Sequence, residues 1–292
     1  MINGFINVNK AADMTSHDAV NRVRRIFNTK KVGHAGTLDP FATGVLPIAV
    51  GRAAKFLEYL SDCDKSYRAE ILFGVETTTD DVTGEVIQQT KCTSEVLNNV
   101  NQVLKSFVGT IQQTPPKYSA IKINGRKAYE LARKNIDFEM PTREVTIYSL
   151  HVVSVAADSV TIDVDCSKGT YIRSLAVDIG NRLGIPATLR HLQRTRAGGF
   201  YIDDSITLET LQEAGESAFI NVDTCLEHLP KFNLPSYRLK AFCSGLTTRI
   251  SDDLSEGTLL RVYVDGDFIG VGKIIDGELK ADKVLMNDKC NS

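Results

Sequence analysis

One carboxylate stands out in this sequence, because it lies in a glycine-punctuated loop between apolar segments. Asp39 belongs to the run GHAGTLDPFATGVL at residues 33–46. Glycines let the backbone of this run turn tightly and approach a ligand closely, while Pro40 keeps Asp39 extended. Asp-Pro commonly begins a turn, which is the alternative explanation. The surrounding residues favour the presentation of Asp39 to a ligand.

Three further groups are candidates to meet Asp39 in one site. Tyr67 opens a strand-like segment from which its phenol could reach a pocket, although an aromatic at a sheet edge is the plainer explanation. Asp80 and Asp81 lie in a threonine-rich segment and are ordinarily turn residues. Arg173 falls in the first turn of a predicted helix, where its charge opposes the helix dipole. The sequence therefore predicts a carboxylate partner for Arg173, and we nominate Asp39.

The elements that must position these residues alternate between strands and amphipathic helices. A helix over 16–27, capped by Thr15 or Ser16, precedes the Asp39 loop, and a buried strand over 45–50 follows it. Apolar periodicity also predicts strands over 4–9, 67–73, 85–89, 144–155, 160–166 and 187–194, and helices over 52–60, 95–107, 127–134 and 171–183. We expect the segments 67–73 and 85–89 to form a hairpin. Such mixing of elements predicts an α+β fold or a mixed α/β sheet.

The composition changes near residues 230–235, where two prolines bracket a linker-like segment. A compact β-rich tail follows, with strands expected over 259–264 and 268–275 and a turn at Asp265-Gly266. Another strand is expected to include Val284 and Leu285. The sequence therefore predicts a domain over 1–235 and a smaller domain over 236–292.

The composition excludes several classes of protein. No apolar run approaches the roughly 18 residues of a membrane helix, and the first residues lack the layout of a signal peptide. We therefore expect a cytoplasmic protein without membrane contact. The six cysteines form no C-x-x-C pair, which indicates reduced thiols and disfavours both a zinc site and a disulfide framework.

Lysine and arginine are concentrated in three segments, although the formal net charge is only -2. These segments are 22–31, 117–134 and 190–196, the last containing Arg190, His191, Arg194 and Arg196, whereas acidic residues are concentrated in 203–227. We expect a basic face opposite an acidic one. Each cluster alone is more often a solvated surface. Together the clusters predict a surface that contacts phosphates.

The run at 33–46 resembles the TruB family of tRNA pseudouridine synthases, and the resemblance covers nearly the whole chain. Its other matching segments are 64–68, 115–133 and 168–175. The resemblance implies an α+β fold, with a pseudouridine synthase catalytic domain whose mixed, largely antiparallel sheet is flanked by helices. It also implies a basic insertion that grips RNA, at about 117–143, and a small β-rich PUA-like domain at the C-terminus.

The resemblance implies a role for each matching residue. Asp39 corresponds to the catalytic aspartate, Arg173 to the arginine that pairs with it, and Tyr67 to a tyrosine that stacks on the uracil and is implicated in proton transfer. His34 corresponds to the histidine that helps to displace the target base, and Asp81 to an acidic residue near the pocket. The adjacent Asp80 leaves that last assignment open. The remaining implied RNA-binding residues are Gly36, Thr37, Lys122, Arg126, Lys127, Tyr129 and Arg133.

The activity implied by the resemblance is isomerisation of a uridine in the T arm of tRNA, uridine 55, to pseudouridine. This reaction cleaves the bond from C1′ to N1, turns the uracil and joins C1′ to C5, so it needs no cofactor and no metal. Reaching C1′ requires extrusion of the nucleotide. Asp39 has three open routes: attack on the sugar, attack on the base, or assistance of elimination to a glycal.

The implied partner is the T-arm stem-loop of tRNA, without an obligatory protein partner. Two alternatives remain open. One is a guide-RNA-dependent pseudouridine synthase subunit, which needs partner proteins, and the other is a non-catalytic protein that binds or folds tRNA.

Overall fold

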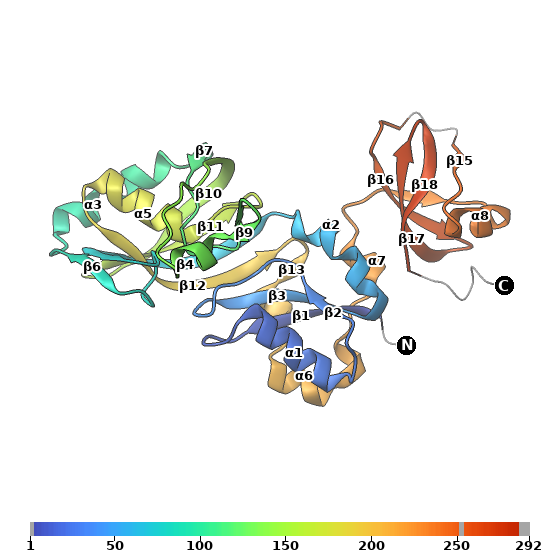
Figure 1. The fold of residues 1–292 in the computed structure, drawn as a ribbon, viewed down its shortest axis with the longest axis horizontal. Coiled ribbons are helices and arrows are strands. Elements are labelled where there is room, and N and C mark those ends of the chain that lie inside the picture. The colour runs from blue at the N-terminus through green and yellow to red at the C-terminus, as the bar shows by residue number, and fades with distance from the viewer. Residues whose placement is uncertain (1–2, 251–253, 286–292) are drawn as a thin grey trace.

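A nine-stranded sheet forms the body of the protein in the computed structural model, which describes residues 3–250 and 254–285 (Figure 1). The central strand order is β1-β3-β12-β4-β11-β10-β7, with β2 beside β3 and β13 beside β12. These strands are β1 (Gly4–Lys10), β2 (Val32–His34), β3 (Thr43–Val50), β4 (Lys65–Phe73), β7 (Gly109–Gln113), β10 (Arg143–Val155), β11 (Ser159–Cys166), β12 (Ala187–Ala197) and β13 (Phe200–Tyr201). The pair of β12 and β3 is parallel and the neighbouring pairs are antiparallel. The mixed, largely antiparallel sheet and the α+β class are therefore confirmed.

Amphipathic helices cover the sheet. The longer ones are α1 (Ser16–Ile26), α3 (Ser94–Lys105), α5 (Ile172–Leu183) and α6 (Leu208–Ala214), and the short ones are α2 (Leu57–Ser61), α4 (Ala128–Ala132), α7 (Val222–Cys225) and α8 (Leu239–Cys243). Helix α1 begins where predicted, because Thr15 and Asp18 exchange hydrogen bonds between side chain and backbone in a capping box. Its Ala19, Val20 and Val23 are buried against the main core.

The predicted hairpin between 67–73 and 85–89 is wrong. Strand β4 pairs with β11 and β12, whereas β6 (Val86–Gln89) pairs with the short β5 (Val75–Thr77). Gly74 separates β4 from β5 with a φ of 88°, and a Cβ there would lie 2.3 Å from the carbonyl oxygen of Thr90. The glycine therefore turns the chain out of the main sheet before the hairpin begins. The predicted helix over 52–60 is also divided, into a 3₁₀ segment (Gly51–Phe56) and α2.

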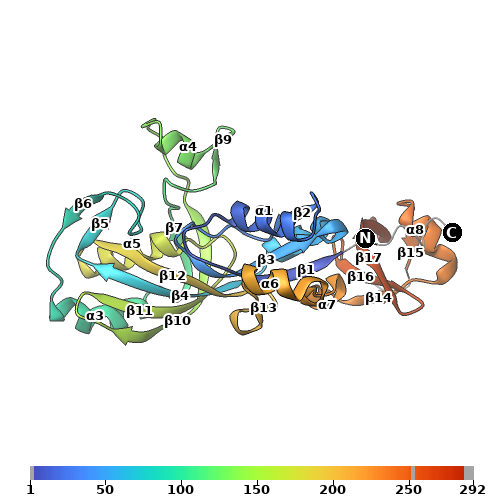
Figure 2. The same cartoon turned by 90° about the horizontal axis from the view of Figure 1, so that it is seen from below.

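The basic insertion projects from the body of the protein (Figure 2). It contains the two-residue strands β8 (Lys122–Ile123) and β9 (Arg126–Lys127), followed by α4. The predicted turn at Asn124-Gly125 joins these strands with positive φ at both residues, as a tight hairpin requires.

A second, five-stranded sheet forms the C-terminal part, in the order β14-β16-β17-β18-β15. Its strands are β14 (Lys231–Asn233), β15 (Thr248–Arg249), β16 (Leu259–Val264), β17 (Asp267–Ile275) and β18 (Glu278–Val284). The segment that we expected to be a linker is thus a strand, because its backbone pairs in parallel with β16. The turn at Asp265-Gly266 lies where predicted.

The two sheets share one apolar cluster. Phe56 at the end of the 3₁₀ segment packs against Phe268 of β17, with ring centroids 6.1 Å apart, and both belong to a cluster that includes Phe5 and Val271. The C-terminal sheet therefore completes part of the core of the main body.

Two further observations concern the cysteines and the helices. Cys63, Cys92, Cys166 and Cys225 are free thiols, as expected for reduced cysteines. Within residues 3–250 and 254–285, no helix has the length and apolar character needed to span a membrane.

Candidate active site

The Asp39 loop connects β2 to β3 and is fixed by polar side chains from outside it. The Ser16 hydroxyl accepts a hydrogen bond from the Leu38 amide at 2.8 Å and lies 3.1 Å from the Leu38 carbonyl oxygen, to which it donates. The Lys10 ammonium donates to the Pro40 carbonyl oxygen at 3.1 Å. The backbone is thus held on both sides of Asp39, whose side chain remains 34% exposed. This geometry presents the carboxylate at a surface.

One glycine of the run at 33–46 is required by the packing of the sheet. Gly44 adopts a φ of 100°, and a Cβ there would lie 2.3 Å from the carbonyl oxygen of Arg194 on β12. The close approach that requires glycine at this position is therefore to a neighbouring strand rather than to a ligand.

Arg173 pairs with Asp39, as predicted. Its Nε lies 2.9 Å from Oδ2 of Asp39, and its Nη2 donates a hydrogen bond to Oδ1 at 3.2 Å. The guanidinium, only 4% exposed, also donates to the carbonyl oxygens of Thr79 and Tyr118, each at 3.0 Å. These contacts from separate segments fix the plane of the guanidinium and, through it, the carboxylate.

Asp81, one of the two adjacent candidates, contacts Arg173. Oδ2 of Asp81 lies 3.7 Å from Nη1 of Arg173, and the Asp81 side chain is 5% exposed. Its other oxygen accepts hydrogen bonds from the Thr79 hydroxyl at 2.8 Å and the Thr83 amide at 3.0 Å. Asp80 instead occupies the left-handed region with a φ of 61°. Arg173 therefore lies between the carboxylates of Asp39 and Asp81.

Burial raises the pKa of Asp39 above that of an ordinary aspartate. The positive charge of Arg173 opposes this shift in pKa, whereas the charge of Asp81 adds to it. Burial likewise raises the pKa of Asp80, to about 6, again against the effect of Arg173. One guanidinium thus balances a group of carboxylates, which is the kind of setting in which active-site carboxylates are tuned.

Tyr67 lies on β4 and is almost completely buried, at 7% exposure. Burial raises the pKa of its phenol; the nearby Arg194 opposes this rise and the charge of Asp39 adds to it. The Tyr67 phenol is therefore buried where the charges of Arg194 and Asp39 act on it.

The other predicted residues of the loop lie before Asp39. His34 ends β2, and burial lowers the pKa of its imidazole. Its Nδ1 is buried without a hydrogen-bond partner among the described residues. Gly36 accepts a hydrogen bond from Arg194 through its carbonyl oxygen, and Thr37 is exposed. The sequence missed the residues that hold this loop, namely Lys10, Ser16 and Arg194; the one signal for Lys10 was a charge within an otherwise buried strand.

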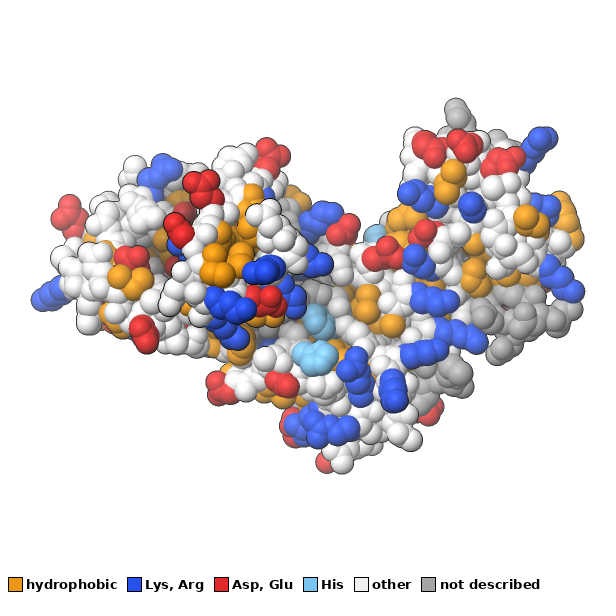
Figure 3. All heavy atoms as spheres, in the orientation of Figure 1, with side chains coloured by type: hydrophobic (Ala, Val, Ile, Leu, Met, Phe, Trp, Pro, Cys, Tyr) orange, Lys and Arg blue, Asp and Glu red, His pale blue; other side chains and the backbone are white. Residues whose placement is uncertain are grey.

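The predicted RNA-binding residues of the insertion are exposed, apart from the half-buried Tyr129. Lys127 and Arg133 lie over the Tyr129 ring, 5.4 and 5.5 Å from its centroid. Figure 3 shows lysine and arginine side chains over this insertion and over the region of α1, with histidines between them. The root of the insertion contacts the site directly, because Tyr118 accepts a hydrogen bond from Arg173.

The third basic segment offers fewer unpaired, exposed cations than its sequence suggests. Arg190 pairs with Glu70 at 2.9 Å and with Asp158 at 3.1 Å, and Arg194 is 1% exposed. The basic and acidic faces are not fully separate either, because Arg22 pairs with Glu209 at 2.9 Å.

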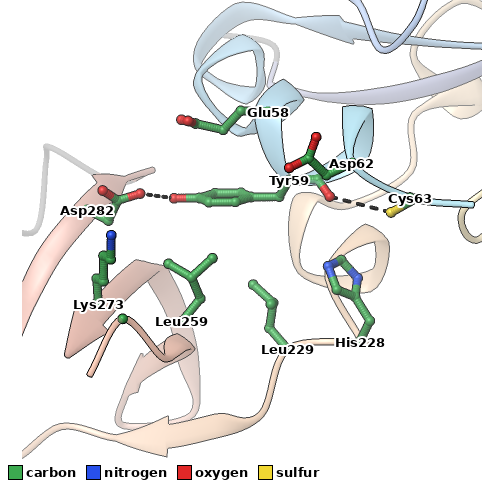
Figure 4. A pocket seen from close by; sticks show the side chains of 10 residues that line it. Glu58, Tyr59, Asp62, Cys63, His228, Leu229, Leu259, Lys273 and Asp282 are labelled. Atoms are coloured by element: carbon green, nitrogen blue, oxygen red, sulfur yellow. Dashed lines mark hydrogen bonds between the residues drawn. The ribbon is translucent and has the colours of Figure 1, made fainter. Parts of the chain in front are cut away.

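A cavity of about 430 Å³ lies away from Asp39, between α2 and the C-terminal sheet (Figure 4). Tyr59 crosses it and donates a hydrogen bond to Asp282 of β18, while Lys283 pairs with Glu58 at 3.0 Å. These contacts join the C-terminal sheet to the main body.

Family models match three successive parts of the chain. Residues 24–172 match the N-terminal domain of the TruB family of pseudouridylate synthases. Residues 173–228 match the C-terminal domain of tRNA pseudouridylate synthase B, and residues 230–285 match the C-terminal part of pseudouridine synthase II TruB.

Curated relatives match over most of their length. The chain is 46% identical over 245 residues to a tRNA pseudouridine synthase B of Bacillus pumilus, covering 80% of this chain and 79% of the relative. It is 42% identical over 290 residues to a tRNA pseudouridine synthase B of Clostridium kluyveri, covering 98% of this chain and 100% of the relative.

Solved structures share the fold. A chain in a crystal structure of a Cbf5-Nop10-Gar1 complex superposes with a TM-score of 0.75 at 27% identity, covering 97% of this chain and 85% of that one. A chain in an H/ACA RNP bound to a substrate RNA containing 2′-deoxyuridine gives the same TM-score at 24% identity, with the same coverage of both chains. Together with the matched domains and the relatives, this means that the chain belongs to the TruB family of pseudouridylate synthases.

Proposed function

We propose that this protein isomerises uridine to pseudouridine in tRNA, with Asp39 as the catalytic carboxylate. The observation that carries the proposal is the contact of the partly exposed Asp39 with the buried Arg173, at 2.9 Å. A carboxylate held in one orientation at a surface can meet the sugar or the base of a nucleotide brought to it. The relatives named tRNA pseudouridine synthase B support the same activity.

Each neighbouring residue has a part in the proposed reaction. Arg173 favours the charged form of Asp39 against burial and fixes its orientation. Tyr67 meets the detached uracil and takes part in moving the C5 proton. His34, beside the loop, helps to bring the nucleotide out of its stack.

We propose uridine 55 in the T arm as the target. Extrusion of a nucleotide costs a few kcal/mol, and stacking on an aromatic ring together with phosphate contacts offsets such a cost. Tyr67 supplies the ring, and the exposed basic residues of the insertion supply the contacts: Lys122, Arg126, Lys127 and Arg133. The reaction would take place in the cytoplasm, which holds the substrate.

A test of the proposal starts from the purified chain and an unmodified T-arm transcript labelled with tritium at uridine C5. We expect release of one tritium per transcript and pseudouridine at a single position by chemical mapping. Asp39→Asn keeps the size of the side chain and should abolish release, whereas binding of the transcript should change less than about threefold. A wild-type rate in Asp39→Asn would show that Asp39 is not the catalytic group.

The same experiment separates the alternatives. Activity of the lone chain on this transcript excludes a requirement for guide RNA and partner proteins, such as those named in the structure of the Cbf5-Nop10-Gar1 complex. Binding of the transcript without any product from the intact chain would instead favour a non-catalytic tRNA-binding or tRNA-folding protein.

A further inference from the structure

Arg194 is the largest of the fully buried side chains, and the proposed reaction gives it no part. Burial of a guanidinium is costly, and proteins usually offset the cost with a carboxylate. Arg194 instead donates hydrogen bonds to two backbone carbonyl oxygens, that of Val45 at 2.7 Å and that of Gly36 at 3.1 Å. The guanidinium therefore holds a segment of backbone in place.

That segment is the Asp39 loop. Gly36 lies near the beginning of the loop and Val45 lies just after its end, in β3. A rigid, planar guanidinium that contacts both carbonyl oxygens fixes the distance between the two ends. Lys10 and Ser16 hold the middle of the loop, at Pro40 and Leu38, so Arg194 supplies the attachment of the ends.

The position of Arg194 in the sheet also relates it to Tyr67. On β12, Arg194 is the parallel register partner of Gly44 on β3 and the antiparallel register partner of Tyr67 on β4. The guanidinium also opposes the rise in the pKa of the buried Tyr67 phenol, which agrees with close contact between the two side chains. One residue thus contacts both the loop that carries the carboxylate and the strand that carries the phenol.

We propose that Arg194 is a positioning residue for the reaction, which fixes the carboxylate of Asp39 relative to the phenol of Tyr67. This inference rests on the proposed function of the site. A misplacement of about 1 Å in an active site lowers a rate by about 10²-fold. Loss of the double contact should therefore slow the chemical step without weakening the binding of tRNA, because Arg194 is buried and cannot contact the substrate.

The test compares Arg194→Lys with a matched control, Arg68→Lys. Lysine keeps the charge, but it is shorter and lacks the rigid planar fork through which Nε and Nη2 of Arg194 reach the two carbonyl oxygens. Arg68 lies on β4 beside Tyr67, and its Nε and Nη2 donate to the two carboxylate oxygens of Asp163 at 2.8 and 2.7 Å on an exposed surface. The control thus removes a two-pronged arginine contact next to the site but outside it.

Single-turnover tritium release is measured at saturating protein, with the transcript Kd and the melting temperature determined for each variant. We expect Arg194→Lys to lower the rate constant about 10²-fold, with an unchanged Kd and with folded protein at the assay temperature. Arg68→Lys should keep the wild-type rate constant. An unchanged rate constant in folded Arg194→Lys overturns the inference. A rise in the Kd that parallels the fall in the rate constant also overturns it.

A second variant covers the case in which Arg194→Lys does not fold. Arg194→Gln retains a neutral donor for one carbonyl oxygen, and we expect the same separation of rate from Kd. If neither variant folds, Arg194 is required for folding and the positioning role is rejected. Inactivity of the wild-type chain, in contrast, would refute the proposed function itself.

Discussion

Arg173 and Tyr118 are joined by a hydrogen bond of 3.0 Å from Nη2 to the backbone carbonyl oxygen, and the same nitrogen also donates to Asp39 at 3.2 Å. The carboxylate and the root of the insertion therefore share one donor. Nη2 carries two hydrogens, so one serves the Tyr118 carbonyl oxygen and the other serves the Asp39 carboxylate. The insertion is thus coupled to the site through a direct contact.

Substitution of Arg173 by lysine should slow pseudouridine formation about 10²-fold. A lysine ammonium cannot contact Asp39, Thr79 and Tyr118 in one plane, so the carboxylate loses its fixed orientation. Single-turnover tritium release at saturating protein measures the effect. Arg182→Lys, on the exposed last turn of the same helix, is the control and should keep the wild-type rate. Equal rates in the two variants would contradict the role of Arg173.

Substitution of Tyr67 by phenylalanine should separate stacking from proton transfer. Phenylalanine keeps the ring that we propose stacks on the base, but it removes the hydroxyl group. If the phenol takes part in moving the C5 proton, tritium release should fall by about 10²- to 10⁴-fold while the transcript Kd stays constant. A wild-type rate would limit Tyr67 to stacking.

Substitution of Asp80 by asparagine should stabilise the protein at neutral pH. The pKa of Asp80 is raised to about 6 by burial, so the folded state binds its proton more tightly than the unfolded state does. Protonated Asp80 therefore stabilises the folded state at low pH, and this stabilisation is lost as the pH rises from about 4 to about 6. Asparagine also tolerates the left-handed backbone at this position. We expect the free energy of unfolding at pH 7.5, measured by urea unfolding, to increase by about 1–2 kcal/mol.

The gain from Asp80→Asn should disappear at pH 4, where the aspartate is protonated in the folded state. Urea unfolding at the two pH values provides the comparison. A gain of equal size at both would mean that the ionisation of Asp80 is not its cause.

Neutralisation of the insertion should weaken tRNA binding in a salt-dependent way. The triple variant Lys122→Gln, Arg126→Gln and Lys127→Gln removes exposed cations from β8 and β9. If each of the three cations contacts a phosphate, the plot of the logarithm of the binding constant against the logarithm of the salt concentration should become less steep. Its negative slope should lose about 2–3 in magnitude. Filter binding of the transcript across a salt series gives the slope, and single-turnover rates at saturation should remain near wild type. An unchanged slope would place the RNA on another surface.

Local sequence patterns predicted the elements near the site, but not how distant strands pair. The cap of α1 depends on Thr15 and Asp18, which are close in sequence, and the dipole argument for Arg173 identified Asp39 as its partner. The burial of Arg194 was not predicted, because it depends on β12 lying between β3 and β4. A basic segment is typical of a surface, and only the sheet order reveals that one of its residues is internal.

The contacts of Arg194 also set an order of events during synthesis of the chain. Arg194 follows Val45 by 149 residues and Gly36 by 158 residues. The ribosome therefore releases the Asp39 loop long before the side chain that holds its ends has been made. Contacts of such large sequence separation form late in folding. A nascent chain that ends before β12 contains Asp39 and the contacts of its loop with Lys10 and Ser16, but it lacks the residue that joins the two ends of the loop. The proposed site is therefore completed only when most of the chain has emerged.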